Sequence, residues 1–258
     1  PLLEGSVVTA TRGARRLAGV TVMRLEDGTP ATGFETRIDC DLLAMSGGWS
    51  PAIHLHSHAG GRMRWDEGTA CFVPDGSLQQ QVSAGAANGC FDLAGCIAEG
   101  SAAGAAMAVQ CGFPAPPPPP PQARVVPTER APADGTPILP LWRVPPARRG
   151  DEGRAFVDLQ NDNTVADIQL AVREGYHSVE HVKRYTALGF GTDQGKTGNI
   201  NGMGIVAQAL GKSIPQVGTT TFRPNYTPVT FGAIAGRDLG ELFEPIRLTA
   251  LHPWHVEH

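Results

Sequence analysis

Helix starts, apolar spacing and helix stops all agree along residues 156–210, and this segment constrains the fold most. Thr164, with Asp167 three residues later, has the capping-box pattern of a helix N-terminus. Ser178 begins a second helical pattern, and glycines follow the apolar stripes as typical helix ends. The three predicted helices end at Gly175, Gly189 and Gly211, and their apolar faces consist of Val165, Ile168 and Val172, of Val179, Val182 and Tyr185, and of Ile200, Met203, Val206 and Leu210.

A loop rich in glycine and polar residues, GFGTDQGKTGN, separates the second and third predicted helices. This three-helix unit resembles the helical iron–sulfur domain of the bacterioferritin-associated ferredoxin type, found in amine-oxidising flavoenzymes. In that module a Cys-x-Cys pair precedes the first helix and Cys-Gln-Gly-Arg-x-Cys follows the second. The corresponding residues here are Asp158, Gln160, Asp193 and Gly198. Because thiolates hold such clusters, the resemblance implies the fold of the module with no iron–sulfur cluster.

Composition excludes several classes of partner. The chain has 258 residues, 41% of them apolar, which is enough for one or two domains with real cores. A net charge of −4 does not indicate a broad electrostatic surface for nucleic acid or an anionic membrane. The sequence contains no apolar run of about 18 residues and no signal-peptide pattern at its N-terminus. We therefore expect a cytoplasmic protein.

The five cysteines include no Cys-x-x-Cys pair. An odd number without close pairs favours a reducing compartment and small buried side chains over disulfide or metal roles. These residues are Cys40, Cys71, Cys90, Cys96 and Cys111.

Residues 1–113 are predicted to be part of an α/β domain. Strands are expected over 6–11, 17–25 and 36–41, and the apolar run 42–45 ends abruptly in SGGWSP. A strand that ends in a glycine pair is typical of the sheet edge where a dinucleotide binds, since glycine lets the backbone approach a phosphate or ring. Gly47, Gly48 and Trp49 would then border the dinucleotide. The alternative is an ordinary tight turn.

Two groups of histidines have spacings that suggest metal ligands. His54, His56 and His58 alternate, so three imidazoles would face one side of a strand. No fourth ligand lies nearby, and surface histidines are the favoured interpretation. The terminal group, His252, His255 and His258, is equally weak evidence for a metal site, so we predict none. A short strand is expected over 69–73.

The stretch 81–109 is predicted to be a strand that ends at Ala84, a glycine turn and a helix from about Phe91. A glycine turn at a helix N-terminus directs backbone N–H groups and the positive end of the dipole toward an anion. The helix is dense in alanine and glycine, so a packing helix without a ligand is the alternative. The layout resembles the last FAD-binding strand of flavoenzymes with two dinucleotide domains, and this resemblance implies that the backbone N–H groups of Gly85, Ala86, Ala87 and Asn88 contact FAD.

The remaining segments give the domain boundaries. Residues 114–150 form a proline-rich linker, with a polyproline spacer and an apolar anchor over 139–144. The helical module spans 151–218. Prolines at 224 and 228 argue against a central strand, so 219–235 is expected to be extended along another surface.

Several motifs of other enzyme classes are absent. Gly-x-Gly-x-x-Gly does not occur, and FGTDQGKT fails as a P-loop because its first glycine position is Phe190. GGWSP lacks the Gly-x-Ser-x-Gly elbow of serine hydrolases. Neither a nucleotide hydrolase nor a serine hydrolase is therefore indicated.

Taken in order, AMSGGWSP, RWDE, AGAANG, the proline linker, the cysteine-free module and TPVTFGAIAG resemble the alpha subunits of heterotetrameric sarcosine oxidases over essentially the whole chain. The resemblance implies a fragment, with a phosphate-binding glycine motif before residue 1 and most of an aminomethyltransferase-like, folate-binding domain after residue 258; residues 219–258 would include its start. It also implies a complex with beta, gamma and delta subunits that oxidises a small amine. FAD and NAD would be bound by the alpha subunit, FMN at its junction with the beta subunit, and tetrahydrofolate in the C-terminal domain. Since the beta subunit would oxidise the amine, no catalytic residue is assigned here.

The polar loop gives a separate hypothesis. Its glycine and basic residues remain although every thiolate is absent, and a lysine beside a glycine-rich backbone suits a phosphate. Gln194, Gly195, Lys196 and Thr197 would hold the FMN phosphate or line a subunit contact. A retained structural loop is the alternative. Two other functions stay open: a scaffold segment without flavins, and a subunit of an opine or proline dehydrogenase, whose modules usually keep the cysteines.

Overall fold

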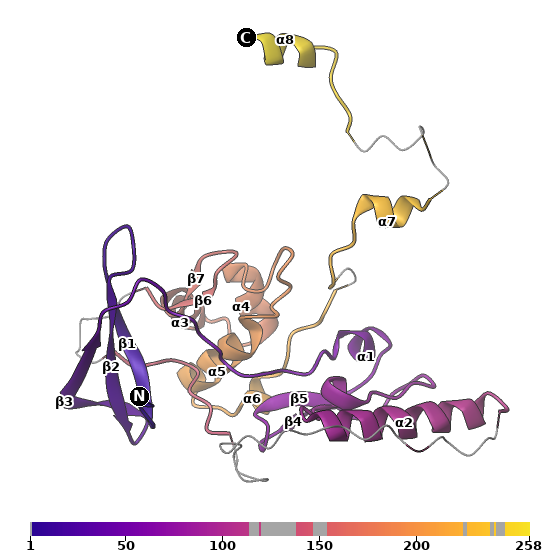
Figure 1. Ribbon diagram of the computed structural model, residues 1–258, viewed down its shortest axis with the longest axis horizontal. Coiled ribbons are helices and arrows are strands. Elements are labelled where there is room, and N and C mark those ends of the chain that lie inside the picture. Colours follow the sequence, from indigo (N-terminus) through magenta and orange to yellow (C-terminus); the bar gives the residue numbers. More distant parts are fainter. Residues whose placement is uncertain are drawn as a thin grey trace. The chain divides into compact units, whose positions relative to one another are not determined.

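The computed structural model describes residues 2–113, 119, 138–146, 154–223, 226–237, 240 and 246–258 (Figure 1). The chain divides into two compact units, Pro1–Arg223 and Pro224–His258. In the described part, three small antiparallel sheets accompany the helices, so the architecture mixes α and β structure as predicted. The arrangement of a two-dinucleotide flavoprotein domain stays a prediction, as do the domain boundaries.

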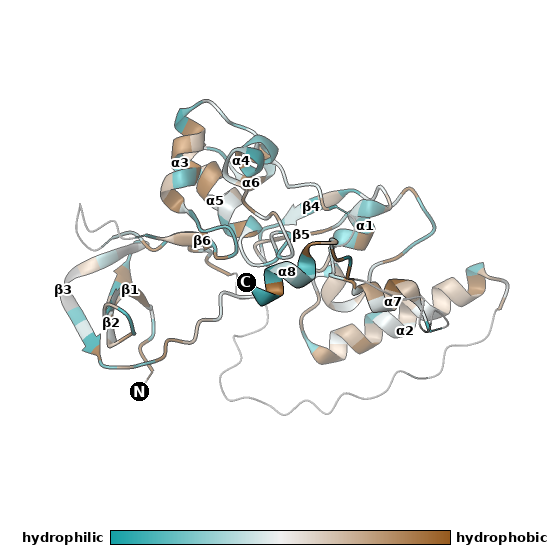
Figure 2. Ribbon diagram, turned by 90° about the horizontal axis from the view of Figure 1, so that it is seen from above, coloured by the Kyte–Doolittle hydropathy of each residue, from teal (hydrophilic) through white to brown (hydrophobic). Residues whose placement is uncertain are grey.

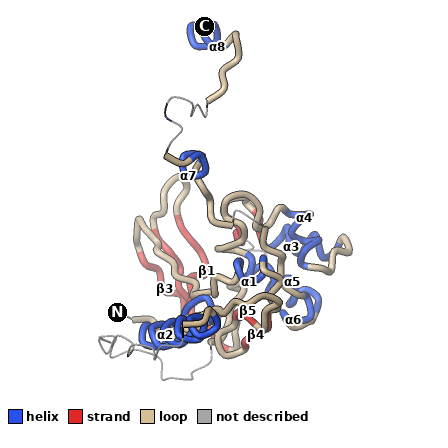
Figure 3. Tube along the Cα trace, turned by 90° about the vertical axis from the view of Figure 1, so that its right-hand side faces the viewer, coloured by secondary structure: helices blue, strands red, loops and turns tan. Residues whose placement is uncertain are grey.

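An antiparallel meander begins the chain, with β1 (Ser6–Arg12), β2 (Gly19–Glu26) and β3 (Thr29–Ile38) side by side (Figure 3). Val7 pairs with Met23 and Val22 with Thr36. Val20 and Met23 of the central strand are buried. The three strands were predicted, but β3 begins earlier than expected. Asp27 and Gly28 both have positive φ and complete a tight turn, so the strand resumes at Thr29.

The apolar run 42–45 was expected to be a strand, and this prediction is wrong. The structure has no strand between β3 and β4, and Leu42, Met45 and Trp49 are all well exposed. The segment has no pairing partner within the described residues, so its apolar character alone does not make it a strand.

The histidine segment, for which loop or surface histidines were favoured over a metal-binding strand, is helical. His54–His58 forms the short helix α1 instead of a strand, so residues spaced by two do not share a face. His56 is buried, and its Nε2 lies 2.8 Å from the carbonyl oxygen of Arg62, which accounts for this imidazole structurally. The two strands after it, β4 (Met63–Asp66) and β5 (Cys71–Pro74), pair in an antiparallel hairpin. In its turn, Asp66 accepts hydrogen bonds from the backbone and hydroxyl of Thr69.

No strand ends at Ala84; the 3-10 helix η1 (Gly85–Asn88) begins there instead. The long helix α2 (Leu93–Gln110) follows, with Asp92 as N-cap accepting a hydrogen bond from Gly95 N–H at 2.7 Å. Figure 2 shows mostly pale and brown residues along α2, because alanine, glycine and apolar side chains dominate it. None of its residues is buried.

The predicted helical module is present. A two-stranded hairpin, β6 (Phe156–Asp158) and β7 (Asn163–Thr164), precedes α3 (Val165–Arg173), α4 (Val179–Thr186), α5 (Asn199–Leu210) and α6 (Ile214–Val217). The capping box of Thr164 and Asp167 forms, and Gly211 has the left-handed conformation after α5. These features confirm the predicted start of the first helix and the predicted end of the third.

Helix α4 differs in two details. Its left-handed terminal residue is Ala187, with φ 62°, so the helix ends before Gly189. Tyr185 was placed on the apolar face, but it is largely exposed, and its ring lies 4.8 Å from that of Tyr176. The buried face of α4 instead consists of Val179, Val182 and Lys183.

The core of the module extends to the preceding segments. Ile168, Val182, Leu188 and Val206 are fully buried at its centre, and Phe72 of β5 belongs to the same cluster. Most of the linker 114–150 lies outside the described residues. Within 138–146, Trp142 packs against this core and Leu139 is exposed, so the predicted anchor is a single tryptophan. A Cβ on Gly204 of α5 would lie 2.3 Å from that indole, so glycine is required there.

The second unit contains the short helices α7 (Phe231–Ala235) and α8 (His252–Glu257). Its described residues include no strand, in agreement with the argument from the prolines. The helix α7 was not predicted. Thr230 caps it by accepting a hydrogen bond from Ala233 N–H at 3.2 Å.

Candidate functional site

The positions that correspond to cluster ligands gather at the β6–β7 hairpin and the loop after α4. Asp158, at the end of β6, is 1% exposed and accepts hydrogen bonds from the backbone N–H groups of Gln160, at 2.8 Å, and Asn161, at 3.0 Å. From the other side of the site, Gly189 N–H donates to the same carboxylate at 2.8 Å. The carboxylate thus joins the two polypeptide segments that a cluster would otherwise bridge.

A second set of hydrogen bonds closes the loop. Gln160 Oε1 accepts from the backbone N–H of Asp193 at 2.6 Å and from the hydroxyl of Thr192 at 3.3 Å. Asp193 Oδ1 in turn accepts from the hydroxyl of Thr197 at 3.1 Å. Three of the four ligand-equivalent residues therefore belong to one hydrogen-bonded network.

The fourth position has no space for a side chain. A Cβ on Gly198 would lie 2.5 Å from the carbonyl oxygen of Val157. The donor set of carboxylate and amide oxygens is not that of an iron–sulfur cluster. In the described part of the chain, no group of three or more His, Cys, Asp and Glu residues is arranged to hold a metal ion.

The network also controls the ionisation of Asp158. Burial alone would raise the pKa of this carboxyl, but hydrogen bonds from Asn161, Gly189 and Gln160 outweigh it, and the pKa is lowered. The charged form is therefore the one that stabilises the fold.

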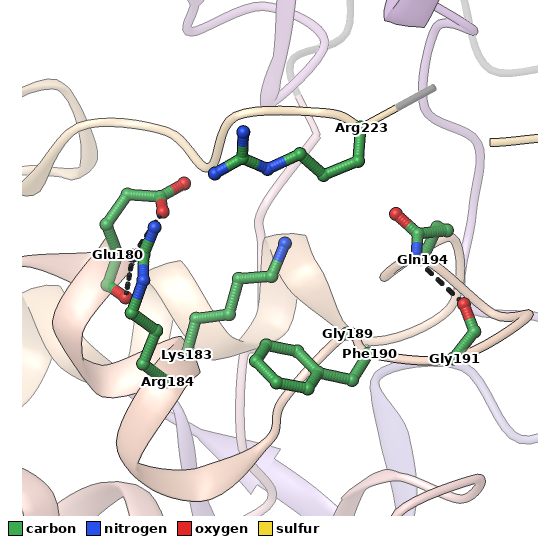
Figure 4. Close-up of a pocket in the computed structure, with 8 residues that line it drawn as sticks. All are labelled: Glu180, Lys183, Arg184, Gly189, Phe190, Gly191, Gln194 and Arg223. Carbon is green, nitrogen blue, oxygen red and sulfur yellow. Dashed lines mark hydrogen bonds and ion pairs between the residues drawn. The ribbon is translucent and has the colours of Figure 1, made fainter. Parts of the chain in front are cut away.

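A pocket of about 280 Å³ adjoins this network (Figure 4). Helix α4 contributes three charged residues to its wall, the loop contributes an aromatic ring and an amide, and the segment after α6 contributes an arginine. These residues are Glu180, Lys183, Arg184, Phe190, Gln194 and Arg223.

The charges in the pocket do not balance. Arg184 donates to the side-chain carboxylate of Glu180 at 2.6 Å, and the backbone N–H of Thr221 donates to the other carboxylate oxygen. Within the described residues, Lys183 and Arg223 form no ion pair or side-chain hydrogen bond. Three cations and one carboxylate give the pocket a net charge of +2.

Lys183 is unusual because it is 8% exposed and faces the pocket. Its Nζ lies 5.9 Å from the centroid of the Phe190 ring. Burial lowers the pKa of Lys183, the carboxylate of Glu180 raises it, and Arg223 and Arg184 lower it further. The net effect is a lowered pKa, as expected for a partly buried lysine with two arginines beside it.

Of the four loop residues singled out in the sequence, Gln194 alone lines the pocket. Its Nε2 donates to the carbonyl oxygen of Gly191 at 2.8 Å. Gly195 packs against Asn199, Lys196 Nζ donates to the carbonyl oxygen of Asp193 at 3.3 Å, and Thr197 bonds to the Asp193 side chain. The loop is thus more strongly bonded to itself than the sequence suggested.

The sequence analysis missed Lys183, Arg184 and Arg223. A usable signal was present for Lys183, because it follows Val179 by four residues and therefore lies on the buried face of α4. A charged residue at a buried helical position marks either a partner or a binding site. Arg223 carried no such signal, since the fold alone brings it to α4.

The two predicted dinucleotide segments occupy different surroundings. Gly85 has positive φ, and its N–H donates to the carboxylate of Glu99 at 2.9 Å; the side-chain amide of Asn88 donates to the same oxygen at 3.2 Å. An anion supplied by α2 therefore occupies the predicted anion contact. Gly47, Gly48 and Trp49 lie in an irregular segment, with the indole exposed.

Comparison with known proteins identifies the module. Residues 152–237 match the family model of the sarcosine oxidase A3 domain. The chain is also 42% identical over 257 residues, its full length, to the sarcosine oxidase alpha subunit of Rhizobium meliloti (strain 1021). The chain is homologous to sarcosine oxidase alpha subunits. It covers 24% of the length of that relative, so about three quarters of the relative has no counterpart here.

A second relative from the same organism is more distant. One of the subunits of its opine oxidase is 26% identical over 218 residues, which is 82% of this chain and 46% of that protein. The solved structure of L-proline dehydrogenase from P. horikoshii matches with a TM-score of 0.58 at 20% identity, covering 89% of this chain and 44% of the other. This structural likeness concerns the fold. Within the described residues, no helix is long and apolar enough to cross a membrane.

Proposed function

We propose that this chain is part of a multi-flavin oxidoreductase that oxidatively demethylates sarcosine. The reaction consumes sarcosine, oxygen and tetrahydrofolate and produces glycine, hydrogen peroxide and methylenetetrahydrofolate. The observation that carries the proposal is 42% identity to a sarcosine oxidase alpha subunit over the full chain. The coarser assignment, an oxidoreductase subunit, rests on both the sarcosine oxidase and the opine oxidase relatives.

In this proposal the chain contributes dinucleotide binding and subunit contact. Gly47, Gly48 and Trp49 would border NAD or FAD, and Gly85, Ala86, Ala87 and Asn88 would approach FAD through the backbone. The Gly85 N–H already donates to the Glu99 carboxylate. FAD would have to displace the Glu99 carboxylate from it.

The loop would contribute at a junction between subunits. Gln194, Gly195, Lys196 and Thr197 would hold the FMN phosphate or contact the beta subunit, and gamma and delta subunits would complete the assembly. Amine oxidation would take place on the beta subunit. The exposure of Lys196 and Thr197 supports a contact role for the loop, because their side chains face solvent.

The test is a sarcosine-dependent peroxide assay on the complete complex, with and without tetrahydrofolate. We expect peroxide in both conditions and methylenetetrahydrofolate only when folate is present. Proline and an opine serve as competing substrates in the same assay. A complex that oxidises either of them and leaves sarcosine unchanged would refute the assignment.

A second candidate is a subunit of an opine or proline dehydrogenase. The fold likeness to L-proline dehydrogenase favours it, although the identity of 26% to the opine oxidase relative is well below the 42% to the sarcosine oxidase. A third is a scaffold without flavins, which the capture of Gly85 N–H by Glu99 favours. Flavin absorbance of the purified alpha subunit distinguishes the scaffold from both enzymes.

A further inference from the structure

The pocket beside α4 contains a lysine whose aliphatic stem is packed in the fold and whose ammonium reaches the pocket without an ion pair among the described residues. Lys183 is 8% exposed, and its ammonium has neither an ion pair nor a hydrogen bond among the described residues. The Nζ atom is not among the buried polar atoms without a partner, so the stem of Lys183 is packed while its charged end remains accessible from the pocket. A cation held in this way is therefore suited to an anionic ligand.

The one carboxylate among the described residues of the pocket wall is already bonded. Glu180 accepts hydrogen bonds from Arg184 and from the backbone of Thr221, so its oxygens are fixed on the side away from Phe190. Figure 4 shows the Lys183 ammonium and the Arg223 guanidinium directed toward the same space. These two groups come from separate elements, α4 and the segment after α6, and both are available as donors.

We propose that this pocket binds the dianionic phosphate of a small phosphate monoester, held by Lys183 and Arg223. The pocket's net charge of +2 matches the charge of that group. An arginine fork and a lysine point charge together suit the several acceptor oxygens of a phosphate. The pocket shares Gln194 with the loop proposed to hold the FMN phosphate, so the inference deepens that part of the proposed function, although its test requires neither sarcosine nor a flavin.

The size of the pocket restricts the ligand. A volume of about 280 Å³ is just below the range for small-molecule sites, roughly 300–1,000 Å³. It admits a phosphate with a modest organic group and excludes a whole dinucleotide. The ring of Phe190 provides an apolar wall beside the lysine, so an aromatic ester fits better than inorganic phosphate.

Lys196 is the competing candidate for a phosphate contact. It is exposed and bonded to the carbonyl oxygen of Asp193, and it does not line the pocket. If the pocket holds the phosphate, substitution of Lys183 should weaken phosphate binding, whereas substitution of Lys196 should not. Lys212, an exposed lysine after α5, provides a control for simple loss of one positive charge.

The experiment is calorimetric titration of the 258-residue chain with phenyl phosphate, inorganic phosphate and benzoate near pH 7.5. We expect phenyl phosphate to bind more tightly than the other two. K183M and R223Q should each weaken the binding of phenyl phosphate by about tenfold or more, as expected for a lost charge-assisted hydrogen bond. K196M and K212M should change the affinity less than about twofold.

A thermal melt of the same variants separates binding from structure. K183M should unfold at about the same temperature as the parent chain, because methionine keeps the packed apolar stem and removes only an ammonium without an ion pair among the described residues. A large decrease would show that Lys183 is structural and would overturn the proposal. Equal loss of binding in K196M or K212M, equal affinity for benzoate, or no measurable binding to the parent chain would also overturn it.

Discussion

Helices α2 and α5 have similar compositions but opposite environments. Both are rich in alanine, glycine and apolar residues, yet α5 buries seven of its residues and α2 buries none. Helix α5 packs against α3, α4 and α6, whereas among the described elements η1 is the main neighbour of α2. The hydrophobicity of a helix therefore does not determine its burial, because burial requires neighbouring elements on several sides.

The same contrast applies to polar groups. In the module that contains α5, Asp158 is buried and bonded on all sides by Gln160, Asn161 and Gly189. Near α2, the Glu99 carboxylate accepts hydrogen bonds from Gly85 N–H and from the side-chain amide of Asn88. The hydrogen bond from Asn88 is exposed to solvent. We expect stability to be concentrated in the module, and the following substitutions test that comparison.

The largest effect is expected in the core. Ile168→Ala removes a side chain that is 0% exposed, so it should lower the free energy of unfolding by about 2–5 kcal/mol. Ile168 belongs to α3, which packs against α5. The comparison change on α2, Leu93→Ala, removes a side chain that is 60% exposed and should change the free energy of unfolding by about 0.5 kcal/mol or less. Native-state hydrogen exchange of the α5 amides measures both changes in the free energy of unfolding. Equal effects would show that α2 also belongs to the cooperative core.

The next effect concerns Asp158. Asp158→Asn replaces a charged acceptor that satisfies several buried N–H groups, so it should cost about 2 kcal/mol at neutral pH. Asp162→Asn, an exposed neighbour with left-handed backbone, is the control and should have little effect. Urea unfolding monitored by far-UV circular dichroism measures the difference.

The same pair of variants predicts a pH dependence. Hydrogen bonds lower the pKa of Asp158 in the folded chain below its usual value of 3.8, although burial opposes them. Its stabilisation is thus fully present above the unfolded pKa and is lost as the pH falls through the lower folded pKa. The difference in the free energy of unfolding between the parent chain and Asp158→Asn should become smaller below about pH 4. A gap that stays constant to about pH 2 would contradict this.

The smallest effect concerns helix capping. Thr164→Ala removes the capping box of α3 and should cost about 1 kcal/mol. It should also raise the pKa of Asp167, because hydrogen bonds from the Thr164 hydroxyl and backbone N–H lower that pKa in the parent chain. Carbon NMR of the Asp167 carboxyl during a pH titration measures this change. Thr230→Ala removes the equivalent cap of α7 and should leave α5 exchange unchanged, because α7 belongs to the other unit. Slower or faster hydrogen exchange of the α5 amides in Thr230→Ala would mean that the stabilities of the two units are coupled.

Local sequence determined the module to a large extent. The capping box at Thr164, the apolar spacing of α3 and α5 and the left-handed Gly211 are all local signals, and the structure contains each of them. The position of the polar loop follows from the same helices. These predictions hold because a helix depends on residues only three or four positions apart.

Where local signals were weak, the prediction failed or was incomplete. An alternating HLHSH is compatible with a strand, but a helix forms because the segment has no strand to pair with in the described part of the chain and His56 binds a distant carbonyl. The end of α4 at Ala187 was missed because alanine rarely adopts positive φ. In both places, contacts outside the segment decide its conformation.

The sequence by itself determined the helices α2, α3 and α5 and the loop that replaces the cysteine-bearing one, since these depend on near neighbours. Only the tertiary structure decided the chemistry of the site. It brought Arg223 to Lys183, engaged Glu180 with Thr221 and directed Glu99 at Gly85 N–H. Such pairs are separated by many residues, and their charges and hydrogen bonds are set by packing that no local pattern encodes.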